Sequence, residues 1–229
     1  MTEEKAFNID PSWKGVITWG GLSLFVAGIV LVLFVLSVLV MQQTLPLPAK
    51  EALENPVPPT ALFILAAIGE LLLLPGGLAL YFSLKNVKKT PMFIATALWL
   101  VATPMFLASR GLIISLSQIS GRYLNTNDEV MKAAYLASTE LAIETQNIYA
   151  AMGLILLSVA SIIVGLVMLK GVFGKRIGYV AIAAGILSIT SPFAVMMGVP
   201  IIIPFIGLIL MAYWQIDIGV KLYKLGGSM

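Results

Sequence analysis

The feature of this sequence that most restricts its fold is a series of six long apolar runs separated by short polar stretches. Each run has about the 20 residues that an α-helix needs to cross the hydrocarbon core of a bilayer. Only 11% of the 229 residues are charged, whereas soluble domains carry about a quarter. We therefore predict an all-α polytopic membrane protein, a single domain folded as a six-transmembrane-helix bundle, with spans at residues 16–41, 59–84, 91–120, 148–169, 177–197 and 201–220.

Two of the connecting segments have patterns of their own. The segment 45–59 contains too many prolines to favour a helix, so a loop is predicted there. In the segment 121–147, Thr126 and Glu129 have the spacing of a helix-capping pair. They precede apolar residues that recur on one helical face, namely Val130, Ala134, Ala137 and Leu141. This pattern predicts a short extracytoplasmic amphipathic helix on the membrane surface before the fourth span.

Lysine and arginine are unevenly distributed between the two predicted sides of the membrane. Six spans place both termini on one side, and that side has ten of these residues: Lys5, Lys14, Lys85, Lys88, Lys89, Lys170, Lys175, Arg176, Lys221 and Lys224. The other side has three, Lys50, Arg122 and Lys132. Because cytoplasmic loops are enriched in basic residues, both termini are predicted to be cytoplasmic. The net charge of +3 follows from this topology, so it does not indicate nucleic-acid binding.

One acidic and one basic residue interrupt neighbouring spans, Glu70 in the second and Arg110 in the third. Helical rise places Glu70 roughly 16 Å below the outer end of its span and Arg110 roughly 15 Å below that of its own. The two charges therefore have matching predicted depths near the middle of the bilayer. Because either charge alone would be costly there, we expect them to pair.

Polar residues near this pair define a candidate intramembrane site. On the third span, Thr103 and Ser117 are each seven residues from Arg110, and Tyr81 shares a face of the second span with Glu70. Two interpretations stay open. The pair is either a structural ion pair that fixes the second helix against the third, or a ligand or proton site.

The sequence Pro75-Gly76-Gly77 is a candidate helix break beside Glu70, because Pro75 frees the carbonyl of Leu71. Pro192 occupies a comparable place in the fifth span. Paired breaks of this kind occur in carriers built from inverted repeats. Ordinary proline kinks are the favoured interpretation, because the prolines of the third and sixth spans do not match in position.

Three further acidic residues have simple structural explanations. Asp217 lies four residues before Lys221, which suits an ion pair at the end of the last span. Glu140 and Glu144 would mark either a polar vestibule above the fourth span or the solvated face of a surface helix. The surface helix is the favoured interpretation.

The residue types that most enzymes use are missing. The chain has no histidine and no cysteine, so the usual general base, the thiolate nucleophile and the usual ligand of haem, zinc and copper are absent. No phosphate-binding or hydrolase motif is found either. We therefore expect no enzymatic activity, no cofactor and no metal.

Three segments resemble a known family. They are the pair Gly20-Gly21 that opens the first span, the run GKRIGYVAIAAG from Gly174 to Gly185, and the tail WQIDIGVKLYKLG from Trp214 to Gly226. With the six-span plan and the chain length, these segments are similar to family 4386 of the domains of unknown function. The resemblance covers most of the chain. It implies a prokaryotic integral membrane protein of six helices and implies no activity.

These observations predict a non-catalytic protein of the prokaryotic plasma membrane. It would be an accessory or structural subunit, or a module that binds a lipid or small ligand. The alternative is a small secondary carrier or channel that uses Glu70 and Arg110. The expected partners are membrane lipids, other membrane subunits or further copies of the chain, and not nucleic acid.

Overall fold

The computed structural model describes residues 10–40, 48–170, 173–194, 198, 200 and 202–228. Within these residues the regular structure is helical throughout, and six helices are long and apolar enough to cross a membrane. The prediction of an all-α six-span bundle is thus confirmed. The helices are α1 (Lys14–Val40), α2 (Ala49–Glu54), α3 (Val57–Leu71), α4 (Leu73–Leu84), α5 (Lys89–Asn125), α6 (Glu129–Met168), α7 (Lys175–Ser188) and α8 (Ile202–Ser228).

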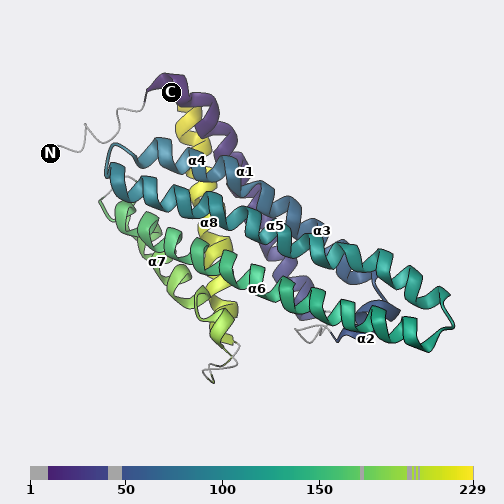
Figure 1. Cartoon of the computed structure of the whole chain (residues 1–229). Coiled ribbons are helices and arrows are strands. Elements are labelled where there is room, and N and C mark those ends of the chain that lie inside the picture. The colour runs from purple at the N-terminus through teal and green to yellow at the C-terminus, as the bar shows by residue number, and fades with distance from the viewer. Residues whose placement is uncertain are drawn as a thin grey trace.

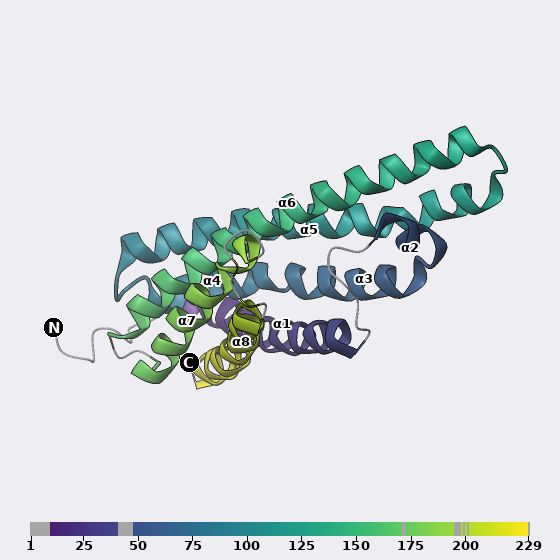
Figure 2. The ribbon, with the colours of Figure 1, turned by 90° about the horizontal axis from the view of Figure 1, so that it is seen from below.

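The long antiparallel pair α5 and α6 forms one side of the bundle (Figure 1). Helices α3 and α4 follow one another along α5, α1 packs against α3, α4 and α8, and α7 lies between α6 and α8 (Figure 2). The main core forms where α1, α4, α5, α6, α7 and α8 meet, and the Trp99 and Trp214 rings lie 5.8 Å apart within it.

Several helices approach so closely that only glycine fits between them. A Cβ added to Gly219 of α8 would lie 2.5 Å from the backbone nitrogen of Phe25 in α1. A Cβ added to Gly165 of α6 would lie 2.7 Å from the carbonyl oxygen of Gly178 in α7. Such backbone proximity is a main source of attraction between helices in a bilayer.

The predicted surface helix before the fourth span does not exist as a separate element. Helix α6 runs without interruption through Glu129–Met168, because no glycine or proline lies between Glu129 and Gly153. Its N-terminus is capped by Asp128, which accepts a hydrogen bond from the Val130 nitrogen at 2.8 Å. Thr126, the predicted cap, instead accepts from the Asp128 nitrogen.

The lengths of α5 and α6 have a consequence for the shape of the molecule. They have 37 and 40 residues, hence lengths of about 55 and 60 Å, whereas the hydrocarbon core of a bilayer is about 30 Å thick. Their joined ends therefore form a helical hairpin that extends past the rest of the bundle (Figure 1).

The proline-rich segment also differs from its prediction. It contains α2, and α3 begins within it at Val57. Pro48 and Pro56 stand directly before α2 and α3, and Pro58 and Pro59 lie in the first turn of α3, where a missing N–H is tolerated. Helix α2 packs on the hairpin, and the hydroxyl of Ser120 donates to the carbonyl of Leu53. A second, smaller core results, formed by Ala52, Phe63, Ile113, Leu116 and Ile143.

Span ends differ by several residues from the predictions. Helix α7 ends at Ser188 rather than at residue 197, and a short 3-10 helix, Ser191–Phe193, contains Pro192. Residues 195–197 and the predicted end of the first span at Met41 lie outside the described residues. Helix α8 continues to Ser228, eight residues beyond its predicted end at 220.

Candidate functional site

The structure places Glu70 and Arg110 in direct contact. Arg110 donates two hydrogen bonds to Oε1 of Glu70, from Nε at 2.9 Å and from Nη2 at 2.7 Å. Each side chain is only 12% exposed. Because Glu70 is near the end of α3 and Arg110 is in α5, the ion pair joins these two helices.

Two phenylalanines enclose the guanidinium group of Arg110. Its central carbon lies 5.3 Å from the ring centroid of Phe34 in α1 and 5.2 Å from that of Phe63 in α3. Both distances are within the range of cation–π attraction. Phe63 is seven residues before Glu70 and so shares its helix face, which the sequence could have revealed. Nothing in the sequence around Phe34 indicates that it contacts Arg110.

A neutral polar contact lies next to the ion pair on the other side of α5. Gln146 of α6 donates from Nε2 to Oγ of Ser109 at 3.0 Å, and both side chains are buried. Sequence reasoning missed this contact, because it assigned residues 121–147 to the exterior of the membrane and did not consider their buried face.

The ion pair lies at a boundary beyond which polar and charged residues appear among the exposed residues of α5 and α6. After Lys89 and Thr90 at its start, the exposed residues of α5 before Arg110 are apolar. They include Phe93, Ile94, Leu100 and Val101. The exposed residues after Arg110 are largely polar, as at Ser115, Ser117, Gln118 and Arg122. On α6 the exposed residues Glu140 and Glu144 precede the exposed apolar Ile148 and Met152. Exposed residues of α1 and α3 stay apolar at this level, including Leu36 and Ile64.

The position of the ion pair along its helices bears on the predicted depth. Arg110 is 21 residues from the first residue of α5, or about 31 Å along the helix, and that distance is a full hydrocarbon thickness. Glu70, in contrast, lies 13 residues after the first residue of α3 and 14 residues before the last residue of α4, so the depth near the middle of the bilayer stays a prediction.

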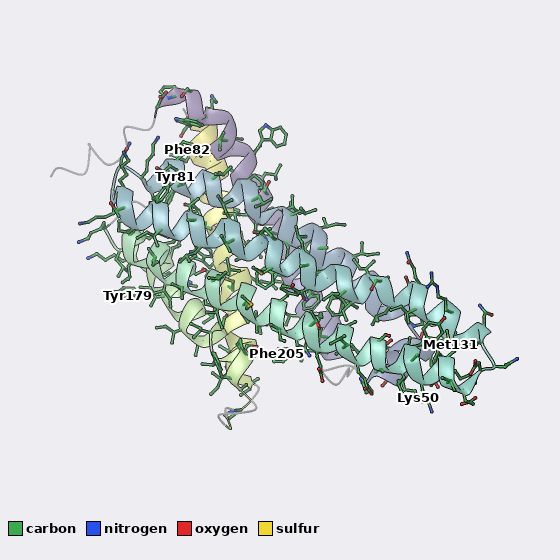
Figure 3. All side chains as sticks on the ribbon, in the orientation of Figure 1. Lys50, Tyr81, Phe82, Met131, Tyr179 and Phe205 are labelled. Atoms are coloured by element: carbon green, nitrogen blue, oxygen red, sulfur yellow. The ribbon has the colours of Figure 1, made fainter. Side chains whose placement is uncertain are left out.

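The other predicted site residues do not join the ion pair. Thr103 is buried and donates to the carbonyl of Trp99, and Ser117 is exposed and donates to that of Ile114. Tyr81 packs on the ring of Phe82 at the far end of α4 (Figure 3). A seven-residue spacing aligns the residues on one face but separates them by about 10 Å per step, so they do not converge.

The predicted helix break is smaller than expected. Leu72 alone separates α3 from α4, and its backbone stays in the helical region at φ −68° and ψ −14°. Pro75 removes the hydrogen bond to the Leu71 carbonyl, but no unwound segment results. Gly76 and Gly77 lie inside α4, where an added Cβ would overlap Leu24 and approach Trp99. These glycines therefore serve close packing.

The three further acidic residues, Asp217, Glu140 and Glu144, do not contact the ion pair. Asp217 and Lys221 form the expected contact, at 4.0 Å, and Lys221 also donates to the Phe173 carbonyl at 3.1 Å. Glu140 and Glu144 are exposed on α6.

One atom of the ion pair is unsatisfied. Oε2 of Glu70 is buried and has no hydrogen-bond partner among the described residues. Within the same residues, no group of three or more His, Cys, Asp or Glu side chains is placed to hold a metal ion. The chemical features of this site are thus a buried ion pair, enclosing aromatic rings and one free carboxylate oxygen.

Comparisons with models of protein families, with curated proteins and with solved structures find no match to the chain. The resemblance to family 4386 of the domains of unknown function therefore stays a prediction.

Proposed function

We propose that this chain is a non-catalytic integral membrane protein, an accessory or structural subunit, in which Glu70 and Arg110 join α3 to α5. The direct contact between the two side chains is the observation that carries this proposal. A pair that opens to pass an ion or bind a substrate needs room between its charges, whereas here both donors of Arg110 already reach Oε1 at 2.9 and 2.7 Å.

The surroundings of the pair support the same role. Phe34 and Phe63 lie against the guanidinium group, so three helices, α1, α3 and α5, meet at one cation. The smaller core continues from Phe63 to Ile113 and Leu116 on the hairpin side. The pair therefore stands between two packed apolar regions, which suits a structural contact.

The proposed setting is a prokaryotic plasma membrane with both termini in the cytoplasm. Lys85 lies 5.5 Å from the ring centroid of Trp13 and Lys221 bonds to Phe173, so the basic loops, the start of α1 and the end of α8 meet at one end of the bundle. Basic residues gathered in this way favour the cytoplasmic side.

A small carrier, or a module for a lipid or small ligand, is the second candidate function. Two observations favour it: Oε2 of Glu70 has no hydrogen-bond partner among the described residues, and the interruption at Leu72 lies two residues after Glu70. A ligand that donates a hydrogen bond would satisfy this oxygen.

Glu70→Gln distinguishes the two functions. We expect wild-type protein in phospholipid vesicles to give no proton or monovalent-cation flux above protein-free vesicles, and Glu70→Gln to lower the midpoint of thermal unfolding. Glu144→Gln, which changes an exposed glutamate, is the matched control and should leave that midpoint unchanged. A wild-type flux that Glu70→Gln abolishes at unchanged stability would overturn the structural proposal and establish the carrier.

A further inference from the structure

Helix α6 carries an outward-facing apolar stripe along much of its length. The stripe consists of Val130, Ala134, Ala137, Leu141, Thr145, Ile148 and Met152. Consecutive members are three or four residues apart, a spacing that keeps them on one helix face. The largest side chains are strongly exposed, with Val130 at 78%, Leu141 at 64% and Ile148 at 61%. We call this set the α6 stripe.

The α6 stripe can be covered without leaving a polar group unpaired. Its one hydroxyl, on Thr145, already donates to the Leu141 carbonyl at 2.7 Å. At its edge, Ser138 donates to the Ala134 carbonyl at 2.8 Å. Burial of these hydroxyls therefore carries little of the usual desolvation cost.

Lipid tails would cover only one end of the α6 stripe. Ile148 and Met152 lie on the apolar side of the boundary on α6, but Val130, Ala134 and Ala137 lie in the hairpin, beyond the exposed Glu140 and Glu144. Figure 3 shows Met131, the neighbour of Val130, near the hairpin tip and far from Tyr81 and Phe82. An exposed apolar surface outside the hydrocarbon indicates a protein contact.

We propose that the α6 stripe is the contact between two copies of this chain. Copies inserted in the same direction are related by a two-fold axis along the membrane normal, which places the two α6 helices side by side and parallel. Equal residues then face each other. Ala134 and Ala137 let the two backbones approach closely, while Val130, Leu141 and Ile148 pack around them.

The distribution of charge beside the stripe suits this symmetry. One edge carries Glu140 and Glu144, and the other carries the uncharged Met131 and Ser138, next to Thr145 of the stripe itself. In a parallel two-fold pair, the left edge of one helix faces the right edge of the other. The glutamates therefore face uncharged residues, and like charges are kept apart. This contact is separate from Glu70 and Arg110 and does not depend on their role.

Single-cysteine variants test the contact directly, because the chain has no cysteine of its own. We expect Ala137→Cys in phospholipid vesicles to form a covalent dimer under mild oxidation, since a disulfide needs the two Cβ atoms within about 4.5 Å. Ser115→Cys, an exposed position on the neighbouring α5, is the matched control and should stay monomeric. Equal cross-linking at both positions, or none at Ala137→Cys, would overturn the proposal.

A charge introduced into the stripe provides the second measurement. Leu141→Glu places two like charges opposite each other and should reduce energy transfer between labelled copies in vesicles at least several-fold. Leu124→Glu changes a residue on α5 that is 59% exposed and should leave that transfer unchanged. A wild-type protein that is monomeric in vesicles would refute self-association.

Discussion

The bundle holds its helices together in two different ways. Helices α1, α6, α7 and α8 approach through glycine, as at Gly219 against Phe25 and at Gly165 against Gly178. Helices α3, α5 and α6 are joined at the hairpin side by side-chain hydrogen bonds, from Arg110 to Glu70 and from Gln146 to Ser109. The first kind of contact depends on the shape of the backbone and the second on the balance of charge and hydrogen bonding.

This difference follows from where each contact lies. Apolar helices gain little from mutual burial in hydrocarbon, so close backbone packing supplies their attraction. The polar contacts lie where charged and polar residues begin to appear among the exposed residues of α5 and α6, and a charge in or near hydrocarbon is costly unless it is paired. We therefore expect the glycine-packed region to be sensitive to added volume and the polar region to be sensitive to unpaired charge.

The largest effect is expected when the ion pair loses one partner. Arg110→Leu leaves the carboxylate of Glu70 buried without a counter-charge, which costs about 3–5 kcal/mol in comparable buried pairs. The free energy of unfolding in mixed detergent micelles would measure this loss.

The double variant tests whether charge balance is the cause. Glu70→Leu combined with Arg110→Leu removes both charges and should recover most of the stability, since replacing a whole buried pair is often close to neutral. A double variant as unstable as Arg110→Leu alone would show that the lost contacts with Phe34 and Phe63 matter more than the unpaired charge.

An intermediate effect is expected in the glycine-packed region. Gly219→Ala adds one methyl group against the backbone of α1 and should lower the free energy of unfolding by about 1–3 kcal/mol, the usual cost of overpacking. Gly227→Ala is the matched control on the same helix, because nothing lies within 4 Å of an added Cβ there. Equal stabilities of the two variants would mean that α1 and α8 can separate slightly without cost.

The contrast between these regions also explains what could be predicted. Charged residues are rare in apolar spans and therefore easy to identify. The pairing of Glu70 with Arg110 could then be predicted by counting residues along the two helices. The partners of Gly219 and Gly165 could not be found in this way, since glycines are frequent in apolar helices and their contacts depend on how the helices cross. Phe34 was missed for the same reason.

The hairpin shows a different limit. The residues Val130, Ala134, Ala137 and Leu141 correctly predicted one apolar helical face, but that face belongs to the first part of α6 and not to a separate surface helix. Helix α6 continues because nothing in its sequence stops it, and its opposite face packs on α5 through buried Gln146 and Ile143. Periodicity identifies a face, but it does not identify what covers that face.

The smallest effect is expected at the neutral polar contact. Gln146→Leu keeps most of the side-chain volume but leaves the buried hydroxyl of Ser109 without its donor from α6. Hydrogen bonds between membrane helices contribute about 0.6 kcal/mol on average, so the free energy of unfolding should fall by less than in Gly219→Ala. Asn147→Leu, at the exposed neighbouring position, controls for added apolar surface. A loss as large as that of Arg110→Leu would mean that Gln146 and the ion pair act as one unit, and a double-variant cycle between the two positions would then show strong coupling.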